Sequence, residues 1–327
     1  MTLRAYCMDW HLKNSDAFRY LLTEALKSRL DITLADVKEW KETDSKQPVI
    51  FCQVMPPDKL LSNPDAKVVW LPMWDNVHQY SQAWWDSLPK HLRVVCFSRA
   101  VYAKANRAGL CSLSLTYFKN PSEVEQVEWT TRRLFYWNRV GLARPEFLHK
   151  LCLATRAEEL IFRPRLDPGT PADRYYELPK QLAGTQVRQI APDNRRSYWD
   201  AINSANIFIA PRPYEGAGMT FLEAMARGAV VMASNAPTMN EYILHRQNGY
   251  LFDSPDSTRP YKQTLHLARR LLRKPMSLPA LPMRQDWAEI GRLDWRALAQ
   301  RARDDHDEGF RRWEDGLDTY AQFLTRW

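Results

Sequence analysis

Residues 207–228 read Ile-Phe-Ile-Ala-Pro-Arg-Pro-Tyr-Glu-Gly-Ala-Gly-Met-Thr-Phe-Leu-Glu-Ala-Met-Ala-Arg-Gly, and they are the most informative segment of the chain. The apolar run Ile207–Ala210 predicts a strand. Gly216 and Gly218 form a Gly-x-Gly turn behind it, and the residues after the turn predict a helix over Met219–Arg227. A strand that enters a helix through a tight turn is the repeating unit of an α/β protein.

Two carboxylates accompany this turn. Glu215 stands in the turn, and Glu223 lies further along on the helix, which Gly228 ends as the residue after the C-cap. The first N–H groups of a helix have no partner within it, and together with the helix dipole they favour an anion. Carboxylates beside an anion would repel it unless the ligand also offers hydroxyl groups. A sugar nucleotide offers both phosphates and hydroxyls, and both carboxylates can face it.

The stretch resembles the donor-binding E-x7-E signature of retaining GT-B glycosyltransferases of family 4. The matching residues are Glu215, Gly216, Gly218, Glu223, Ala224, Met225, Ala226 and Gly228. The residues Glu241-Tyr-Ile and Asn248-Gly-Tyr-Leu resemble the segment that follows the motif in that family. Two surface glutamates on an amphipathic helix are the alternative explanation, and the joint match over residues 205–253 outweighs it.

The resemblance implies a GT-B fold, in which two doubly wound Rossmann-like domains face each other across a cleft and C-terminal helices cross back to the first domain. We expect an acceptor-binding domain over residues 1–118, joined by roughly residues 305–327, and a donor-binding domain over residues 131–300. The polar segment 116–130 contains Asn-Pro and is the expected linker. No glycine-rich loop comes after the first predicted strand, which departs from many family members.

Alternation of short apolar runs with helical periodicity independently predicts parallel sheets. The predicted strands are Leu3–Trp10, Ile32–Val37, Pro48–Val54, Lys67–Leu71, Arg93–Ser98, Leu134–Trp137, Glu159–Arg163, Val187–Ile190, Ile207–Ala210 and Val230–Ser234. The predicted helices are Asp16–Arg29, Ala100–Ala108, Pro145–Thr155, Arg195–Ala205, Met219–Arg227, Glu241–His245 and Tyr261–Arg273, and a charged, periodic helical tail covers Trp287–Trp327.

Two arginines are expected at the donor diphosphate. Transfer from a nucleoside diphosphate sugar builds negative charge on the diphosphate, so fixed cations and N–H donors stabilise the transition state. Arg139 matches a family arginine, and Arg144 stands where the family has a lysine. Arginine keeps the charge and adds a bidentate fork suited to phosphate.

The resemblance also assigns the other donor residues. It places Glu223 at the ribose hydroxyls and Glu215 at the donor sugar, and the nucleotide base against the strand end 187–191. The expected donor-binding residues are Gly216, Ala217, Gly218, Met219, Thr220, Glu223 and Ile190. Nothing at that strand end selects uracil over guanine, so the donor is a UDP- or GDP-sugar, and the family needs no metal.

On the acceptor side, Trp74 replaces a histidine common in the family, while Asp75 of the same pair remains. Asp75 is therefore counted with the catalytic residues. His78 either substitutes for the missing histidine or is a solvent-facing or capping residue. Ser98 either touches the ligand or caps the next helix.

The composition of the chain limits the classes of binding partner that we expect. The chain has 327 residues, a formal net charge of +8 and 45% hydrophobic residues, as expected of a globular protein of roughly two domains. No nucleic-acid-binding module accompanies the charge, so nucleic acid is not an expected partner. The pair Trp84-Trp85 beside Lys90 predicts either a patch for an anionic membrane or core packing.

Five cysteines without C-x-x-C spacing and a chain start without signal-peptide character predict a cytoplasmic protein with unpaired thiols. The run Asp304-Asp305-His306-Asp307 lies in a predicted charged helix, and we do not interpret it as a metal site.

The sequence therefore predicts a retaining, metal-independent glycosyltransferase that acts on a glycan or lipid-linked glycan in bacterial surface polysaccharide (lipopolysaccharide or capsule) biosynthesis. The alternatives are a catalytically inactive GT-B module that binds nucleotide or glycan, and a transferase for a soluble small molecule or protein.

Overall fold

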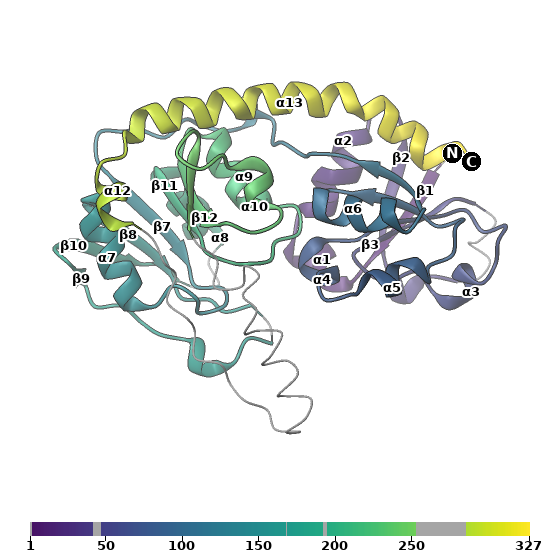
Figure 1. Ribbon diagram of the computed structural model, residues 1–327, viewed down its shortest axis with the longest axis horizontal. Helices are drawn as coiled ribbons and strands as arrows, with labels where there is room; N and C mark the ends of the chain where they lie inside the picture. The colour runs from purple at the N-terminus through teal and green to yellow at the C-terminus, as the bar shows by residue number, and fades with distance from the viewer. Residues whose placement is uncertain (1, 42–46, 168, 192–194, 253–285) are drawn as a thin grey trace. The chain divides into compact units, whose positions relative to one another are not determined.

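The computed structural model describes residues 2–41, 47–167, 169–191, 195–252 and 286–327 (Figure 1). The chain divides into two compact units. Unit 1 comprises Met1–Lys119, Tyr214–Met219 and Asp307–Trp327, and unit 2 comprises Asn120–Pro213 and Thr220–His306. The predicted helix Tyr261–Arg273 lies outside the described residues.

Unit 1 is built on a six-stranded parallel sheet with the strand order β2-β1-β3-β4-β5-β6. Its strands are β1 (Thr2–Cys7), β2 (Asp31–Asp36), β3 (Val49–Cys52), β4 (Val68–Leu71), β5 (Arg93–Cys96) and β6 (Cys111–Ser114). Every residue of β3 and β4 is buried, which explains their continuous apolar runs. The sequence did not predict β6, because its residues mix polar and apolar side chains and half of them are exposed.

Apart from the C-terminal helix, the described helices of unit 1 are short. They are α1 (Asp9–Asn14), the π-helix η1 (Arg19–Thr23), α2 (Glu24–Leu26), the 3-10 helix η2 (Val37–Glu39), α3 (Asp58–Leu61), α4 (Trp74–Val77), α5 (Gln82–Asp86) and α6 (Arg99–Arg107). The predicted helix Asp16–Arg29 is present in part, with a π turn at its centre that sequence periodicity did not indicate. Gly109 lies just after α6 with φ +69°, as expected of a residue after a C-cap.

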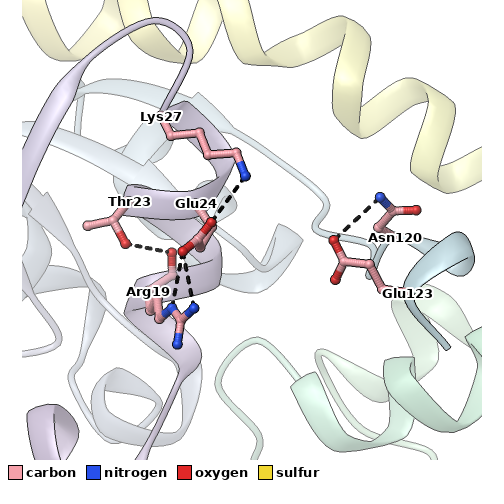
Figure 2. A network of polar contacts seen from close by, with 6 residues as sticks. All are labelled: Arg19, Thr23, Glu24, Lys27, Asn120 and Glu123. Carbon is pink, nitrogen blue, oxygen red and sulfur yellow. Dashed lines mark hydrogen bonds and ion pairs between the residues drawn. The ribbon is translucent and has the colours of Figure 1, made fainter.

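Figure 2 shows the charged groups on the π turn. Arg19 and Lys27 both donate to Glu24, at 3.2 and 3.3 Å, and these contacts lower the pKa of the Glu24 carboxyl. The groups are exposed, so the pairs contribute little to stability. The same figure shows Asn120, whose amide reaches Glu123 at 3.5 Å and whose side-chain oxygen caps the 3-10 helix η4 (Pro121–Glu123) of unit 2.

Unit 2 is built on a seven-stranded sheet with the order β13-β12-β11-β7-β8-β10-β9. Its strands are β7 (Arg133–Trp137), β8 (Glu159–Arg163), β9 (Gln181–Leu182), β10 (Thr185–Gln189), β11 (Ile207–Ala210), β12 (Val230–Ser234) and β13 (Gly249–Phe252). The pairings are parallel except that of β9 with β10.

Besides η4 and the first part of the C-terminal helix, the described helices of unit 2 are α7 (Pro145–Thr155), η5 (Ala172–Arg174), α8 (Arg195–Ser204), α9 (Met219–Ala226, whose first residue belongs to unit 1), α10 (Met239–Tyr242) and α12 (Trp287–Gly291). The predicted helix Glu241–His245 is wrong in its bounds. A capping box between Thr238 and Glu241 starts the helix at Met239, and the chain is extended again at Ile243.

The tail ends in one long helix, α13 (Trp295–Thr325, yellow in Figure 1). It belongs to unit 2 up to His306 and to unit 1 from Asp307 onward. In unit 1, Trp313 and Tyr320 pack against Phe97, with ring centroids 6.3 and 6.2 Å apart. The predicted return of the tail to the first part of the chain is confirmed.

The tryptophan pair of unit 1 belongs mainly to its core. Trp85 is fully buried and lies 5.6 Å from the Trp70 ring, and Trp84 stacks on Tyr80 at 4.1 Å. Of the two interpretations of this pair, core packing is confirmed for Trp85.

All five cysteines are unpaired. Cys7, Cys52, Cys96 and Cys152 are buried, and only Cys111 is exposed. Burial raises the pKa of the Cys7 and Cys152 thiols to about 11.

Two glycines of α13 predict opposite responses to alanine. A Cβ at Gly309 would overlap the ring of Phe118, whereas a Cβ at Gly316 would lie 3.7 Å from Leu115. Alanine normally stabilises a helix interior by about 1 kcal/mol relative to glycine. We therefore expect Gly316→Ala to raise the free energy of unfolding, and Gly309→Ala to lower it by roughly 1–3 kcal/mol through overpacking. Urea denaturation of both variants checks this, and a stabilised Gly309→Ala would contradict the packing.

His306 predicts acid sensitivity. The residue is fully buried, and burial lowers its pKa from 6.5 to about 4. Between these values the unfolded chain binds a proton that the folded protein does not, so stability falls as the pH drops through this window, by roughly 3 kcal/mol in total. We expect His306→Leu to flatten the curve of unfolding free energy against pH between 6.5 and 4. An unchanged slope would show that other groups dominate.

Candidate functional site

The centre of the unit 2 sheet is a topological switch point. β7 pairs with β8, the next strand along the chain, on one side and with the distant β11 on the other. Ligands of open parallel sheets bind at the carboxyl ends of the strands where the order reverses. The loops after Trp137 of β7 and Ala210 of β11 leave the sheet at this point, and they carry the predicted residues Arg139 and Glu215.

Asn138 organises the loop after β7. Its buried side chain accepts hydrogen bonds from the Tyr136 hydroxyl (3.3 Å) and the Gly141 N–H (2.9 Å), and it donates to the Arg174 carbonyl (3.3 Å). Gly141 has φ +65°, and a Cβ there would lie only 2.6 Å from the Arg174 Cβ. The loop that presents Arg139 is therefore fixed by the Asn138 hydrogen bonds and by the close packing of Gly141 on Arg174.

Arg139 is held by a carboxylate that the sequence did not single out. Its Nε lies 3.0 and 3.2 Å from the two carboxylate oxygens of Asp167, and its carbonyl accepts the Asp167 N–H at 2.7 Å. Arg212, on the loop after β11, lies 3.7 Å from the same carboxylate. One carboxylate thus holds guanidinium groups from both loops of the switch point.

A buried arginine lies beside this cluster. Arg163, at the end of β8, is only 4% exposed, and its guanidinium lies 4.2 Å from the Trp137 ring and 4.4 Å from the Tyr198 ring. Burial raises the pKa of Tyr198, and the charge of Glu223 raises it further, while Thr220, Arg163 and Arg139 oppose the shift. Tyr198 therefore connects the arginine cluster with the start of α9.

Glu223 points into the protein from α9. It is 7% exposed, and its charge acts on Tyr198 and on the buried Arg227. Gly218 precedes α9 with φ +71°, a conformation that glycine adopts without strain. The turn ends where the helix begins, as the Gly-x-Gly pattern predicted.

The turn before α9 packs closely on α4 within unit 1. A Cβ on Gly216 would lie 3.2 Å from the Asp75 Oδ1 and 3.3 Å from the Met73 Cβ, so glycine permits this approach. The ring of Tyr214, next to Glu215, stacks on His78 with centroids 3.7 Å apart and planes 14° apart. The structure thus brings Asp75 and His78, two predicted site residues, to the turn that carries Glu215.

Three further predicted site residues have structural contacts of their own. Ser98 is buried, and its hydroxyl accepts the Ala100 N–H at 3.2 Å, so it caps α6. Ile190 has a buried side chain and donates its N–H to the Phe162 carbonyl at 2.9 Å. Trp74 begins α4 and packs edge-on against His78 at 6.3 Å.

Arg144 is exposed and lines a cavity of about 270 Å³ with Tyr176, Arg174 and Glu146 among its other walls. None of the residues of the Arg139–Asp167–Arg212 cluster lines this cavity. The structure therefore records different surroundings for the two arginines that were expected on one diphosphate.

Sequence reasoning missed Arg163, Asp167, Tyr198 and Arg212. The arginine between Pro211 and Pro213 was a visible signal, since prolines restrict the backbone of a functional loop. Asp167 gave no signal, because only the folding of the β8 loop brings it to Arg139.

Within the described ranges, no three His, Cys, Asp or Glu side chains converge as a metal site would require. Across that same part of the chain, no helix combines the length and apolar character needed to cross a bilayer.

Comparisons with known proteins agree with this geometry. Residues 173–293 match the family model described as Glycosyl transferases group 1. A comparison of the sequence with curated proteins finds no match. Among solved structures, the chain resembles a glycosyltransferase from Rickettsia africae ESF-5 (TM-score 0.57, 11% identity, 100% of this chain and 99% of that one). It also resembles a sucrose-phosphate synthase from Thermosynechococcus elongatus (TM-score 0.58, 12% identity, 99% of both chains) and Alr3699/HepE from Anabaena in complex with UDP-glucose (TM-score 0.53, 12% identity, 98% of this chain and 100% of that one).

Two parallel Rossmann-like sheets and the return of α13 to unit 1 define a GT-B protein, as these structural matches show. Residues 173–293 carry a domain of the group 1 glycosyltransferase type, the family that the E-x7-E residues resemble.

The hydrogen bonds of Asn138 predict how much the loop after β7 contributes to the free energy of unfolding. Asn138→Ala leaves the Gly141 N–H and the Arg174 carbonyl without their buried partner, and we expect it to lower the free energy of unfolding by roughly 2–3 kcal/mol. Asn138→Asp would set a carboxylate oxygen against the Arg174 carbonyl and bury its charge, so it should cost at least as much. Urea denaturation measures both variants, and an unchanged free energy of unfolding in Asn138→Ala would show that these contacts do not hold the loop.

Proposed function

We propose that this group 1 glycosyltransferase moves a sugar from a UDP- or GDP-sugar to a glycan acceptor with retention of the anomeric configuration. The observation that carries the proposal is that Arg139 and Tyr198 both contact the Trp137 ring at the carboxyl end of β7, while the charge of Glu223 on α9 acts on Tyr198. The Anabaena structure that this chain resembles holds UDP-glucose, which makes UDP-sugars the first donors to test.

The proposed chemistry rests on fixed positive charge. As the sugar departs, negative charge grows on the diphosphate, and Arg139 with the N–H groups at the start of α9 stabilises it. Arg144 supplies further charge from the same loop. With these cations in place the reaction requires no divalent metal, and we expect turnover to survive an excess of EDTA.

The two carboxylates of the motif have separate proposed roles. Glu223, buried on α9, binds the ribose hydroxyls. Glu215 acts at the donor sugar, and Asp75 supports it because the Gly216 backbone lies against the Asp75 carboxylate. The peptide groups of Gly216–Met219, with Thr220, complete the donor contacts.

The acceptor is proposed to approach Trp74 and His78, where the half-buried rings of His78 and Tyr214 stack beside the turn. A glycan fits these aromatic and polar groups, and surface polysaccharide assembly in the cytoplasm is the setting that we propose. The net charge of +8 favours an acceptor that carries phosphate or a lipid anchor in an anionic membrane. The buried Trp85 takes no part in such a contact.

A panel of nucleotides and nucleotide sugars tests the proposal by thermal shift, because a ligand that binds the folded state raises the melting temperature. A shift with UDP or GDP, and then transfer of the sugar to a glycan with retained configuration by NMR, is the expected result. Nucleotide binding without donor hydrolysis or transfer would favour the inactive module, and the absence of any shift would contradict a donor site.

The roles of the two glutamates predict different binding defects. We expect Glu223→Gln to weaken UDP binding about tenfold, or about 1.4 kcal/mol, because the ribose loses its carboxylate. Glu215→Gln should leave UDP affinity unchanged and reduce UDP-sugar turnover, because its partner is the sugar. Calorimetric titration with UDP and a hydrolysis assay measure both. The exposed Glu308→Gln is the control, and equal loss of UDP affinity in both motif variants would contradict these roles.

A further inference from the structure

The sheet of unit 1 has a switch point of its own. β1 pairs with β2, the next strand along the chain, on one side and with β3 on the other, and all three strands are parallel. Ligands of open parallel sheets bind outside the carboxyl ends of the strands at such a point. The segments that leave the sheet there are α1, which follows Cys7, and the loop that begins with Gln53.

The backbone of Gln53 is strained. Its φ is +64°, and the Val54 N–H donates to the Cys52 carbonyl at 2.7 Å, which makes a γ-turn of the rare form with positive φ. The Gln53 N–H donates to the Leu71 carbonyl at 2.8 Å, and its carbonyl accepts from the Asn76 amide at 3.2 Å. These contacts fix a conformation that is otherwise unfavourable, and such strain is concentrated at functional sites.

The side chains of His11, on α1, and Gln53 meet at this edge of the sheet. Burial lowers the pKa of His11, and Gln53 acts on it in the opposite direction, so the two groups are neighbours. Neither ring nitrogen of His11 nor the Oε1 atom of Gln53 makes a hydrogen bond of normal geometry with a described residue, although all three atoms are shielded from solvent. Buried polar atoms without a partner destabilise a fold, so a group from outside the chain is the partner that they fit.

The polar groups of this His11–Gln53 site are neutral, which indicates the class of ligand. With its pKa lowered, the His11 ring is uncharged at neutral pH and offers one donor and one acceptor. The charges of Asp9 and Lys13 on α1 pair with each other at 2.7 Å. Trp10, 47% exposed, adds an aromatic ring 5.1 Å from the His11 ring. Neutral donors and acceptors beside an aromatic ring suit the hydroxyl groups and the apolar face of a sugar.

Within unit 1, the His11–Gln53 site shares a helix with the turn before α9. Asn76, whose amide holds the Gln53 carbonyl, lies in α4. Asp75 of the same helix is the residue against which Gly216 packs, because a Cβ on Gly216 would lie 3.2 Å from its Oδ1. Helix α4 therefore connects the strained backbone to the turn that carries the first motif glutamate.

We propose that His11 and Gln53 bind hydroxyl groups of the acceptor sugar and that the Trp10 ring packs against it. This proposal rests on the proposed function and names residues that select its acceptor. Glycine at position 53 would relieve the backbone strain, but it would remove the amide that binds the sugar.

The test is an NMR titration that follows the imidazole ¹⁵N signals. Wild-type protein without donor is titrated separately with glucose, galactose, mannose, rhamnose and N-acetylglucosamine, and the His11 signals are assigned by their loss in His11→Asn. We expect at least one sugar to shift the His11 signals to saturation and to leave those of His149, an exposed residue of α7, unchanged. No shift at His11, or equal shifts at both histidines, would overturn the proposal.

Variants of Gln53 separate binding from support of the fold. Gln53→Leu should weaken sugar binding about tenfold, the loss expected for one hydrogen bond, whereas Gln300→Leu at an exposed position of α13 should not change it. Gln53→Gly should weaken binding equally and raise the melting temperature, because glycine adopts positive φ without strain. Wild-type sugar affinity in both Gln53 variants, or a lower melting temperature in Gln53→Gly, would overturn the proposal.

The titration contains no nucleotide, so its outcome is separate from that of the donor site. Wild-type protein that binds neither UDP nor GDP would contradict the proposed function itself. Nucleotide binding without sugar contact at His11 would overturn only the role of the His11–Gln53 site.

Discussion

The parallel pairing of β7 with β11 is the constraint on which the donor site depends. The two strands lie about seventy residues apart in the chain, and their adjacency reverses the strand order of the sheet. Because both strands point the same way, the loops after Trp137 and Ala210 leave from one edge. Every further feature of the site uses this edge: the Asn138 network, the Asp167 carboxylate between two arginines, and the turn into α9.

The sequence predicted the local parts of this arrangement well. Helix α7 and strands β8, β11 and β12 have the bounds expected of them, since each combines a clear period with a proline or glycine boundary. Sequence patterns did not predict the elements whose structure depends on residues distant in the chain. The polar residues of β6 form a strand because they pair with β5, and the π turn of η1 has no signature in side-chain periodicity.

The candidate site shows the same division. The motif gave Glu215, Gly218 and Glu223, because a strand, turn and helix are contiguous in sequence. Arg163 ends strand β8 and Asp167 lies in the loop that follows it, and only the fold brings them to Arg139. Ser98 shows what the sequence leaves open: a serine at a strand end suits a ligand or a helix cap, and the structure shows that its hydroxyl caps α6 through the Ala100 N–H.

The cysteines give the molecule a set of internal reporters. A thiol reacts as its thiolate, so Cys7, Cys52, Cys96 and Cys152, buried and with raised pKa, are protected as long as their surroundings stay closed. Three of them lie in the strands of unit 1 and one in α7 of unit 2. With Cys111 blocked, the appearance of a second reactive thiol marks local opening, and its position tells which of the two units has opened.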